Sequence, residues 1–112
     1  MAFERFDVVV VPFPFTDRTT TKRRPALVLS DAGVFNQRAG HSVLAMITSA
    51  RHSNWPLDAD ITDLDSAGLP APSLVRMKLF TLADQLVIRQ AGRLAGPDQQ
   101  TVTDRIGRLL GK

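Results

Sequence analysis

Short apolar runs separated by turn residues fill most of this sequence, and they limit the fold more than any other feature. Residues 7–11 include four consecutive valines, typical of a strand buried on both faces. Further apolar or alternating runs predict strands at 26–30, 42–49, 57–62, 73–80 and 86–89. Helical spacing of apolar residues begins only after Pro97, with Val102, Ile106, Leu109 and Leu110 on one face. The pattern predicts a mainly β fold, a small antiparallel barrel of five or six strands with a C-terminal helix.

The segments between these runs are predicted to be loops and turns. Prolines at 12 and 14 cannot donate backbone hydrogen bonds and should end the first strand, and Pro25 should open the second. Residues 16–24 are polar, rich in threonine and basic, which predicts an exposed hairpin loop. Residues 31–41 contain two glycines and an asparagine and are predicted to be a loop, and 65–70 a turn.

Length and composition exclude several classes of protein. The 112 residues fit one domain, expected to span 1–112. The absence of cysteine removes disulfides, thiolate nucleophiles and thiolate metal sites, and the two histidines are too far apart for a local metal motif. No apolar run is long enough to cross a bilayer, and the first seven residues lack the pattern of a signal peptide. We therefore expect a cytoplasmic protein with no membrane association.

The charge distribution favours a polyanionic partner. The net charge is +3 and the pI is about 10.2, with arginine far outnumbering lysine. An acidic block at 51–65 lies between two basic regions. Within the block, Asp58 and Asp60 share a strand face, where paired carboxylates more often prevent edge aggregation than bind a metal.

Three groups of residues are candidates for binding or catalysis. Lys22, Arg23 and Arg24 either form a phosphate clamp or belong to a solvated loop. Thr48 and Ser49 follow an apolar run. They either serve only to terminate the strand or, if Thr48 faces the same cleft as Arg24, its hydroxyl and the guanidinium together bind one phosphate.

Arg76 and Lys78 share a predicted strand face with Leu74 and Phe80, while Val75, Met77 and Leu79 take the other face. The basic stripe suits single-stranded nucleic acid or an acidic protein segment, and the alternative is an ordinary solvated face. His52 could reach the same cleft as Thr48, although a loop histidine is more often only exposed, and Trp55 is expected to pack rather than to stack on a base.

Several of these residues together resemble the PemK/MazF family, the toxins of type II toxin–antitoxin pairs. The resemblance rests on these segments of the sequence: FDVVVVPFPFTD from residue 6, KRRPALVLS from 22, MITS from 46, GLPAPSLVR from 68, KLFTL from 78 and GRL from 92. The resemblance covers nearly the whole chain. A sequence would rarely contain by chance both the Pro-Phe-Pro-Phe motif and the Arg-Arg-Pro motif that follows it.

The resemblance implies an SH3-like barrel, a homodimer, and metal-independent, ribosome-independent cleavage of single-stranded RNA at short sequences, with no cofactor. The products would carry a 2′,3′-cyclic phosphate and a 5′-hydroxyl. The family's essential arginine and threonine fall on Arg24 and Thr48, which would be catalytic. The residues expected to bind RNA are Phe15, Thr16, Lys22, Arg23, Ser49, His52, Arg76 and Lys78. Some members carry an acid where this chain has Lys78, so a carboxylate base at that position is in doubt, and His52, water or a residue of a partner subunit could take the proton instead.

The resemblance also implies a cognate antitoxin with an acidic, partly disordered tail, and DNA binding only through that antitoxin. Two alternatives remain open at this point. One is a protein-binding toxin with a similar barrel, such as the CcdB-type gyrase poisons, which act through the last helix rather than through an arginine–threonine pair. The other is a degenerate member that only binds its antitoxin.

Overall fold

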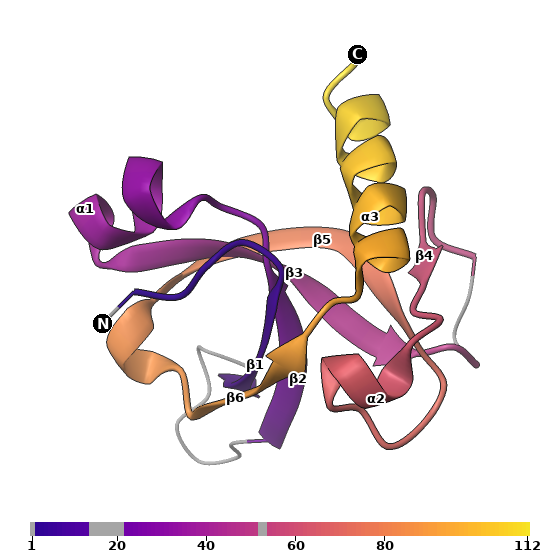
Figure 1. The fold of residues 1–112 in the computed structure, drawn as a ribbon, viewed down its shortest axis with the longest axis horizontal. Coiled ribbons are helices and arrows are strands. Elements are labelled where there is room, and N and C mark those ends of the chain that lie inside the picture. The colour runs from indigo at the N-terminus through magenta and orange to yellow at the C-terminus, as the bar shows by residue number, and fades with distance from the viewer. Residues whose placement is uncertain (1, 14–21, 52–53) are drawn as a thin grey trace.

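The computed structural model describes residues 2–13, 22–51 and 54–112 and shows a curled, six-stranded antiparallel sheet with a long helix at the C-terminus (Figure 1). The strands lie in the order β4-β5-β3-β2-β1-β6. Their bounds are β1 Asp7–Phe13, β2 Lys22–Val28, β3 His41–Ser49, β4 Ala59–Asp60, β5 Ser73–Ala83 and β6 Arg89–Arg93. The helical segments are η1 Ala32–Asn36, α1 Gln37–Ala39, α2 Leu64–Ala67, η2 Asp84–Leu86 and α3 Gly96–Leu109. The predicted mainly β fold with a C-terminal helix is confirmed.

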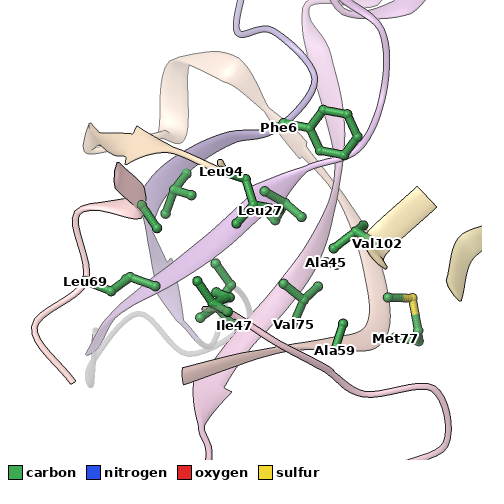
Figure 2. Close-up of a cluster of buried hydrophobic side chains, with 13 residues drawn as sticks. Phe6, Leu27, Ala45, Ile47, Ala59, Leu69, Val75, Met77, Leu94 and Val102 are labelled. Carbon is green, nitrogen blue, oxygen red and sulfur yellow. The ribbon is translucent and has the colours of Figure 1, made fainter. Parts of the chain in front are cut away.

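Apolar side chains pack on both faces of this sheet, which explains the valine run of β1. Val8 and Leu27 belong to a larger cluster on one face, to which α3 contributes Val102 (Figure 2). Val9 and Val11, which point the other way, belong to a second cluster with Ala26, Val28, Leu44 and Leu82. The sheet therefore has little solvent-exposed area near its centre, and a binding surface has to lie towards the ends of the strands.

The two strands β1 and β2 both extend further than predicted, up to the pair of Phe13 with Lys22. Pairing continues to Phe13 opposite Lys22, so Pro12 does not end β1 and residues 22–24 belong to a strand rather than a loop. Pro25 lies inside β2, opposite Val10. The pairing of β2 with β3 reaches only Ala26, and that of β1 with β6 reaches only Val10. At each of these prolines the strand is thus paired on one side only, and such positions tolerate a missing N–H.

The predicted loop at 31–41 is wrong, because its first nine residues are largely helical. The Asp31 carboxylate accepts a hydrogen bond from the Val34 N–H and caps η1. Asn36 is fully buried, and its side-chain amide donates to the carbonyls of Phe3 at 2.7 Å and Ser30 at 3.0 Å. A long-range contact with Phe3 therefore holds this turn, and local sequence does not reveal it.

Three later boundaries also differ from the prediction. Only 59–60 of the predicted strand 57–62 pairs with β5, and part of the predicted turn at 65–70 is the helix α2, capped by Asp63. Hydrogen bonds from the backbone and hydroxyl of Ser66 lower the pKa of Asp63, which keeps this cap ionised. β6 starts at Arg89 instead of residue 86, because 84–86 form a 3₁₀ turn in which Asp84 accepts a hydrogen bond from the Ser42 hydroxyl at 2.7 Å.

The helix α3 begins with Pro97 in its first turn, as predicted, but its apolar face is shorter than predicted. Val102 is buried and Ile106 packs against the core, whereas Leu109 is exposed and Leu110 is 68% exposed. The C-terminal turns of α3 extend beyond the sheet (Figure 1), and both leucines lie outside the two apolar clusters. Among the described residues, no helix is long and apolar enough to span a membrane.

We expect Gly92→Ala to destabilise the fold by about 2 kcal/mol, because α2 lies directly against β6. A Cβ at Gly92 would lie 2.4 Å from the Ser66 carbonyl oxygen and 2.6 Å from the Ala67 carbonyl carbon, and neither backbone atom can easily move. The matched control is Gly107→Ala in α3, where a Cβ meets nothing within 4 Å and should stabilise the helix by about 0.5–1 kcal/mol. Thermal melts of the two variants should shift in opposite directions. Equal shifts would contradict the close α2–β6 packing.

Candidate functional site

The three cations Lys22, Arg23 and Arg24 occupy the first positions of β2, opposite Phe13, Pro12 and Val11. All three are exposed, and no ion pair involves any of them within the described part of the chain. The strand fixes their spacing and makes their side chains alternate between the two faces of the sheet. Pairing with β1 therefore fixes the backbone of these three residues, which the predicted loop would not do.

Arg24 and Thr48 occupy equivalent positions on neighbouring strands. Ala26 of β2 pairs with Met46 of β3, and each of the two residues lies two positions beyond that pair. Because side chains repeat every second residue, alternation directs both towards the same face of the sheet. Arg24 is exposed, while Thr48 is half-buried opposite Leu74 of β5. Alternation thus directs a guanidinium and a hydroxyl to one face, where β2 begins and β3 ends.

Two depressions flank this end of the sheet, and Arg24 and Thr48 line different ones. The first, which we call the arginine pocket, has a volume of about 260 Å³ and includes three arginines, Arg23, Arg24 and Arg89. Its other lining residues are Val10, Pro25, Gly68, Leu69, Pro70 and Ala91. Arg89 reaches it because β6 pairs with β1 at Val10, directly across from Pro25. Arg89 was not among the predicted site residues, because the sequence pattern puts it at the end of a strand.

The second depression, which we call the threonine pocket, has a volume of about 280 Å³ and contains Thr48. Its other lining residues are Phe13, Met46, Arg76, Lys78, Leu79 and Phe80. It combines an apolar floor with two cations and one hydroxyl. That composition suits a ligand with both flat apolar parts and negative charge, such as a nucleotide.

Arg76 is held in place by Asp58, the residue just before β4. Its Nη2 and Nε atoms donate to the two carboxylate oxygens of Asp58 at 2.9 and 3.2 Å, a bidentate pair. The hydrogen bond to Asp58 raises the pKa of Arg76 further above its already high value, so the guanidinium stays charged. Asp58 is thus paired with a side chain on β5, and Asp60 is exposed on the edge strand β4, as the edge-protection interpretation predicts.

A bulge in β5 changes which of its side chains face the solvent. Ala45 pairs with Leu79 but Met46 pairs with Arg76, so Met77 and Lys78 are two extra residues on β5. Val75 and Met77 are buried as predicted. Leu79, however, is 43% exposed and lines the threonine pocket. The prediction that Leu74 flanks the basic stripe at the surface is also wrong, because Leu74 is buried.

Trp55 lies beside the two cations of β5. The Lys78 Nζ is 4.5 Å from the centroid of the indole ring, and the Arg76 guanidinium carbon is 6.0 Å from it. The indole Nε1 donates to the Met77 carbonyl at 3.4 Å. The ring is nevertheless 41% exposed, so the expectation that Trp55 packs holds for only part of its surface.

The remaining predicted site residues lie in different situations. Ser49 is exposed at the end of β3, opposite Ser73, and its hydroxyl accepts a hydrogen bond from the Arg51 N–H. Phe15, Thr16 and His52 lie outside the described residues. Among the residues that are described, no three His, Asp or Glu side chains gather in a group that could hold a metal ion.

Comparison with known proteins identifies the family. A model of the PemK-like, MazF-like toxins of type II toxin–antitoxin systems matches residues 4–110. No curated protein matches the chain. Among solved structures, MazF from Deinococcus radiodurans superposes with a TM-score of 0.75 at 23% identity, covering 100% of this chain and 99% of the other.

Two further structures show the same fold. The MazE–MazF complex of D. radiodurans (Form-III) matches with a TM-score of 0.76 at 23% identity, over 99% of this chain and 98% of that one. A mycobacterial endoribonuclease in complex with its cognate antitoxin matches with a TM-score of 0.74 at 16% identity, over 98% and 94% of the two chains. Identities this low support the fold alone, whereas the family model covers nearly all of the sequence. The chain belongs to the PemK/MazF-like toxins of type II toxin–antitoxin systems.

Proposed function

We propose that this toxin, as one domain spanning 1–112 and as a homodimer in the cytoplasm, cleaves single-stranded RNA at short specific sequences without a metal ion. The observation that supports the proposal is the register of β2 against β3: Arg24 and Thr48 each lie two residues beyond the Ala26–Met46 pair, so alternation directs both towards one sheet face. Two similar structures are of proteins named endoribonucleases, which supports the same activity here.

In the proposed reaction the RNA 2′-oxygen attacks the adjacent phosphorus while its proton passes to His52, water or a residue of the partner subunit. The bond to the 5′-oxygen then breaks, and that oxygen takes up a proton from solvent. The products are a 2′,3′-cyclic phosphate and a 5′-hydroxyl. Negative charge grows on the non-bridging oxygens, and the Arg24 guanidinium can meet two of them with parallel N–H donors. Arginine stays protonated at neutral pH, so its role is charge stabilisation, including a hydrogen bond donated to the leaving 5′-oxygen. Thr48 orients the phosphate through its hydroxyl.

The other basic residues bind the flanking nucleotides. Lys22, Arg23 and Arg89 surround or adjoin the arginine pocket and are not ion-paired within the described part of the chain, so they can neutralise backbone phosphates. Lys78 supplies a further exposed cation at the threonine pocket. Arg76 contributes less free charge, because Asp58 already accepts two of its hydrogen bonds.

The same surface suits the acidic, partly disordered tail of a cognate antitoxin. Exposed arginines line the arginine pocket and apolar side chains line the threonine pocket. A flexible acidic segment with a few hydrophobic anchors suits such a combination. We therefore expect RNA and antitoxin to compete, with inhibition by occlusion. Titrating the toxin–antitoxin complex with a labelled, uncleavable RNA should show displacement, and added salt should weaken RNA binding more steeply than antitoxin binding. A stable ternary complex with unchanged RNA affinity would rule out occlusion.

A further inference from the structure

Trp55 is a large apolar side chain that the fold keeps at the surface. It lies in the connection between β3 and β4, and its ring belongs to neither of the two apolar clusters. The backbone on both sides of it is unusual, since Asn54 has φ +97° and Leu57 has φ +66°. Residues other than glycine rarely adopt such values, and leucine hardly ever does, so the connection keeps the ring where it is at a conformational cost.

The contacts of the indole fix its position and leave 41% of the residue exposed. Its N–H is satisfied by the Met77 carbonyl in the β5 bulge, and Lys78 places its ammonium over the ring. The bulge therefore aligns Trp55 with the strand that supplies Arg76 and Lys78 to the threonine pocket. The outcome is a partly exposed aromatic surface with cations beside it, next to a pocket that contains the proposed catalytic hydroxyl.

We infer that Trp55 is a stacking platform for one base of the single-stranded RNA, adjacent to the nucleotide bound in the threonine pocket. This inference rests on the proposed function. Aromatic rings stack on bases of any sequence, and the neighbouring ammonium of Lys78 pairs with the phosphate of the stacked nucleotide. A purely structural role, in which Trp55 only shields the Arg76–Asp58 pair from water, accounts for the contact with Arg76 but not for the exposed part of the ring.

The test uses the intrinsic fluorescence of the protein, because Trp55 is its only tryptophan. A single-stranded RNA with 2′-O-methyl groups lacks the attacking hydroxyl and is not cut, so it reports binding alone. We expect it to quench the Trp55 emission, and removal of one particular base to restore that emission. By anisotropy of a labelled copy, Trp55→Ala should bind about tenfold more weakly and Trp55→Phe within about threefold of the parent.

A second comparison separates stacking from a structural role. Removing the stacked base should weaken binding by the parent but leave binding by Trp55→Ala unchanged. Phe35→Ala, which removes an exposed aromatic side chain from η1 at the far side of the fold from β4, is the control and should bind like the parent (Figure 1). Parent-like affinity of Trp55→Ala, or an equal loss for every base-lacking RNA, would overturn the stacking platform. Failure of the parent to bind or cut any RNA would instead overturn the proposed function.

Discussion

Replacing Arg24 with alanine is expected to lower the rate of RNA cleavage about a thousandfold, roughly 4 kcal/mol of transition-state stabilisation. The guanidinium is the proposed partner of the charge that develops on the phosphorus-bound oxygens, and alanine offers no donor in its place. The fold should be unaffected, because Arg24 is exposed and forms no ion pair among the described residues. The rate is measured on a labelled single-stranded RNA, and the fold by thermal melting.

Two companion variants sharpen this result. Arg38→Ala removes an exposed arginine from α1, and it should cleave like the parent. Thr48→Val keeps the shape of the side chain and removes only its hydroxyl, so a large loss of rate there would show that the threonine pocket belongs to the reaction. If Arg24→Ala cleaved within about tenfold of the parent, the assignment of the catalytic arginine would be wrong.

Asp98→Ala is expected to destabilise the fold by about 3 kcal/mol and to lower the melting temperature by on the order of 10 °C. Asp98 is only 2% exposed in the first turn of α3. Its carboxylate accepts hydrogen bonds from the N–H groups of Thr62 and Asp63 and from the Thr62 hydroxyl, at 2.7–3.1 Å. Alanine would leave these donors without their partner and would loosen α3 from the segment that follows β4.

The control is Asp104→Ala, which removes an exposed carboxylate of the same helix whose partners are the surface residues Arg105 and Arg108. Surface pairs of this kind contribute little, so its melting temperature should stay within about 2 °C of the parent. A similarly small shift for Asp98→Ala would mean that α3 is attached mainly through Val102 and Ile106.

The strands with the strongest local pattern were predictable from the sequence. The valines of β1 and the apolar run of β3 appear where expected, and Pro97 marks the start of α3. The helical turn at 32–39 was not predictable, because it depends on the buried amide of Asn36 reaching Phe3. The extension of β1 and β2 past their prolines depends on which neighbouring strands end first, and this is a property of the whole sheet.

The candidate site, too, was only partly predictable from the sequence. The resemblance of the sequence to a known family singled out Arg24 and Thr48, and strand alternation now directs them to one face. The sequence could not indicate that Asp58 holds Arg76, because that contact follows from the register of β4 against β5, in which Ala59 pairs with Val75. Nor could it indicate that Trp55 lies beside Lys78, one of the two extra residues of the β5 bulge. Arg89 was missed for a similar reason, since its place in the arginine pocket follows from the register of β6 against β1.

The most direct test is to incubate the purified toxin with a mixed RNA pool in the presence of a chelator and to map both ends of every fragment. We expect cuts at one short recurring sequence, with a 2′,3′-cyclic phosphate on one side and a 5′-hydroxyl on the other, and no cuts by Arg24→Ala. Intact RNA from a toxin that still arrests growth would contradict this activity and favour a protein-binding toxin. Fragments with 5′-phosphates, or cleavage that requires a divalent metal, would contradict the proposed mechanism.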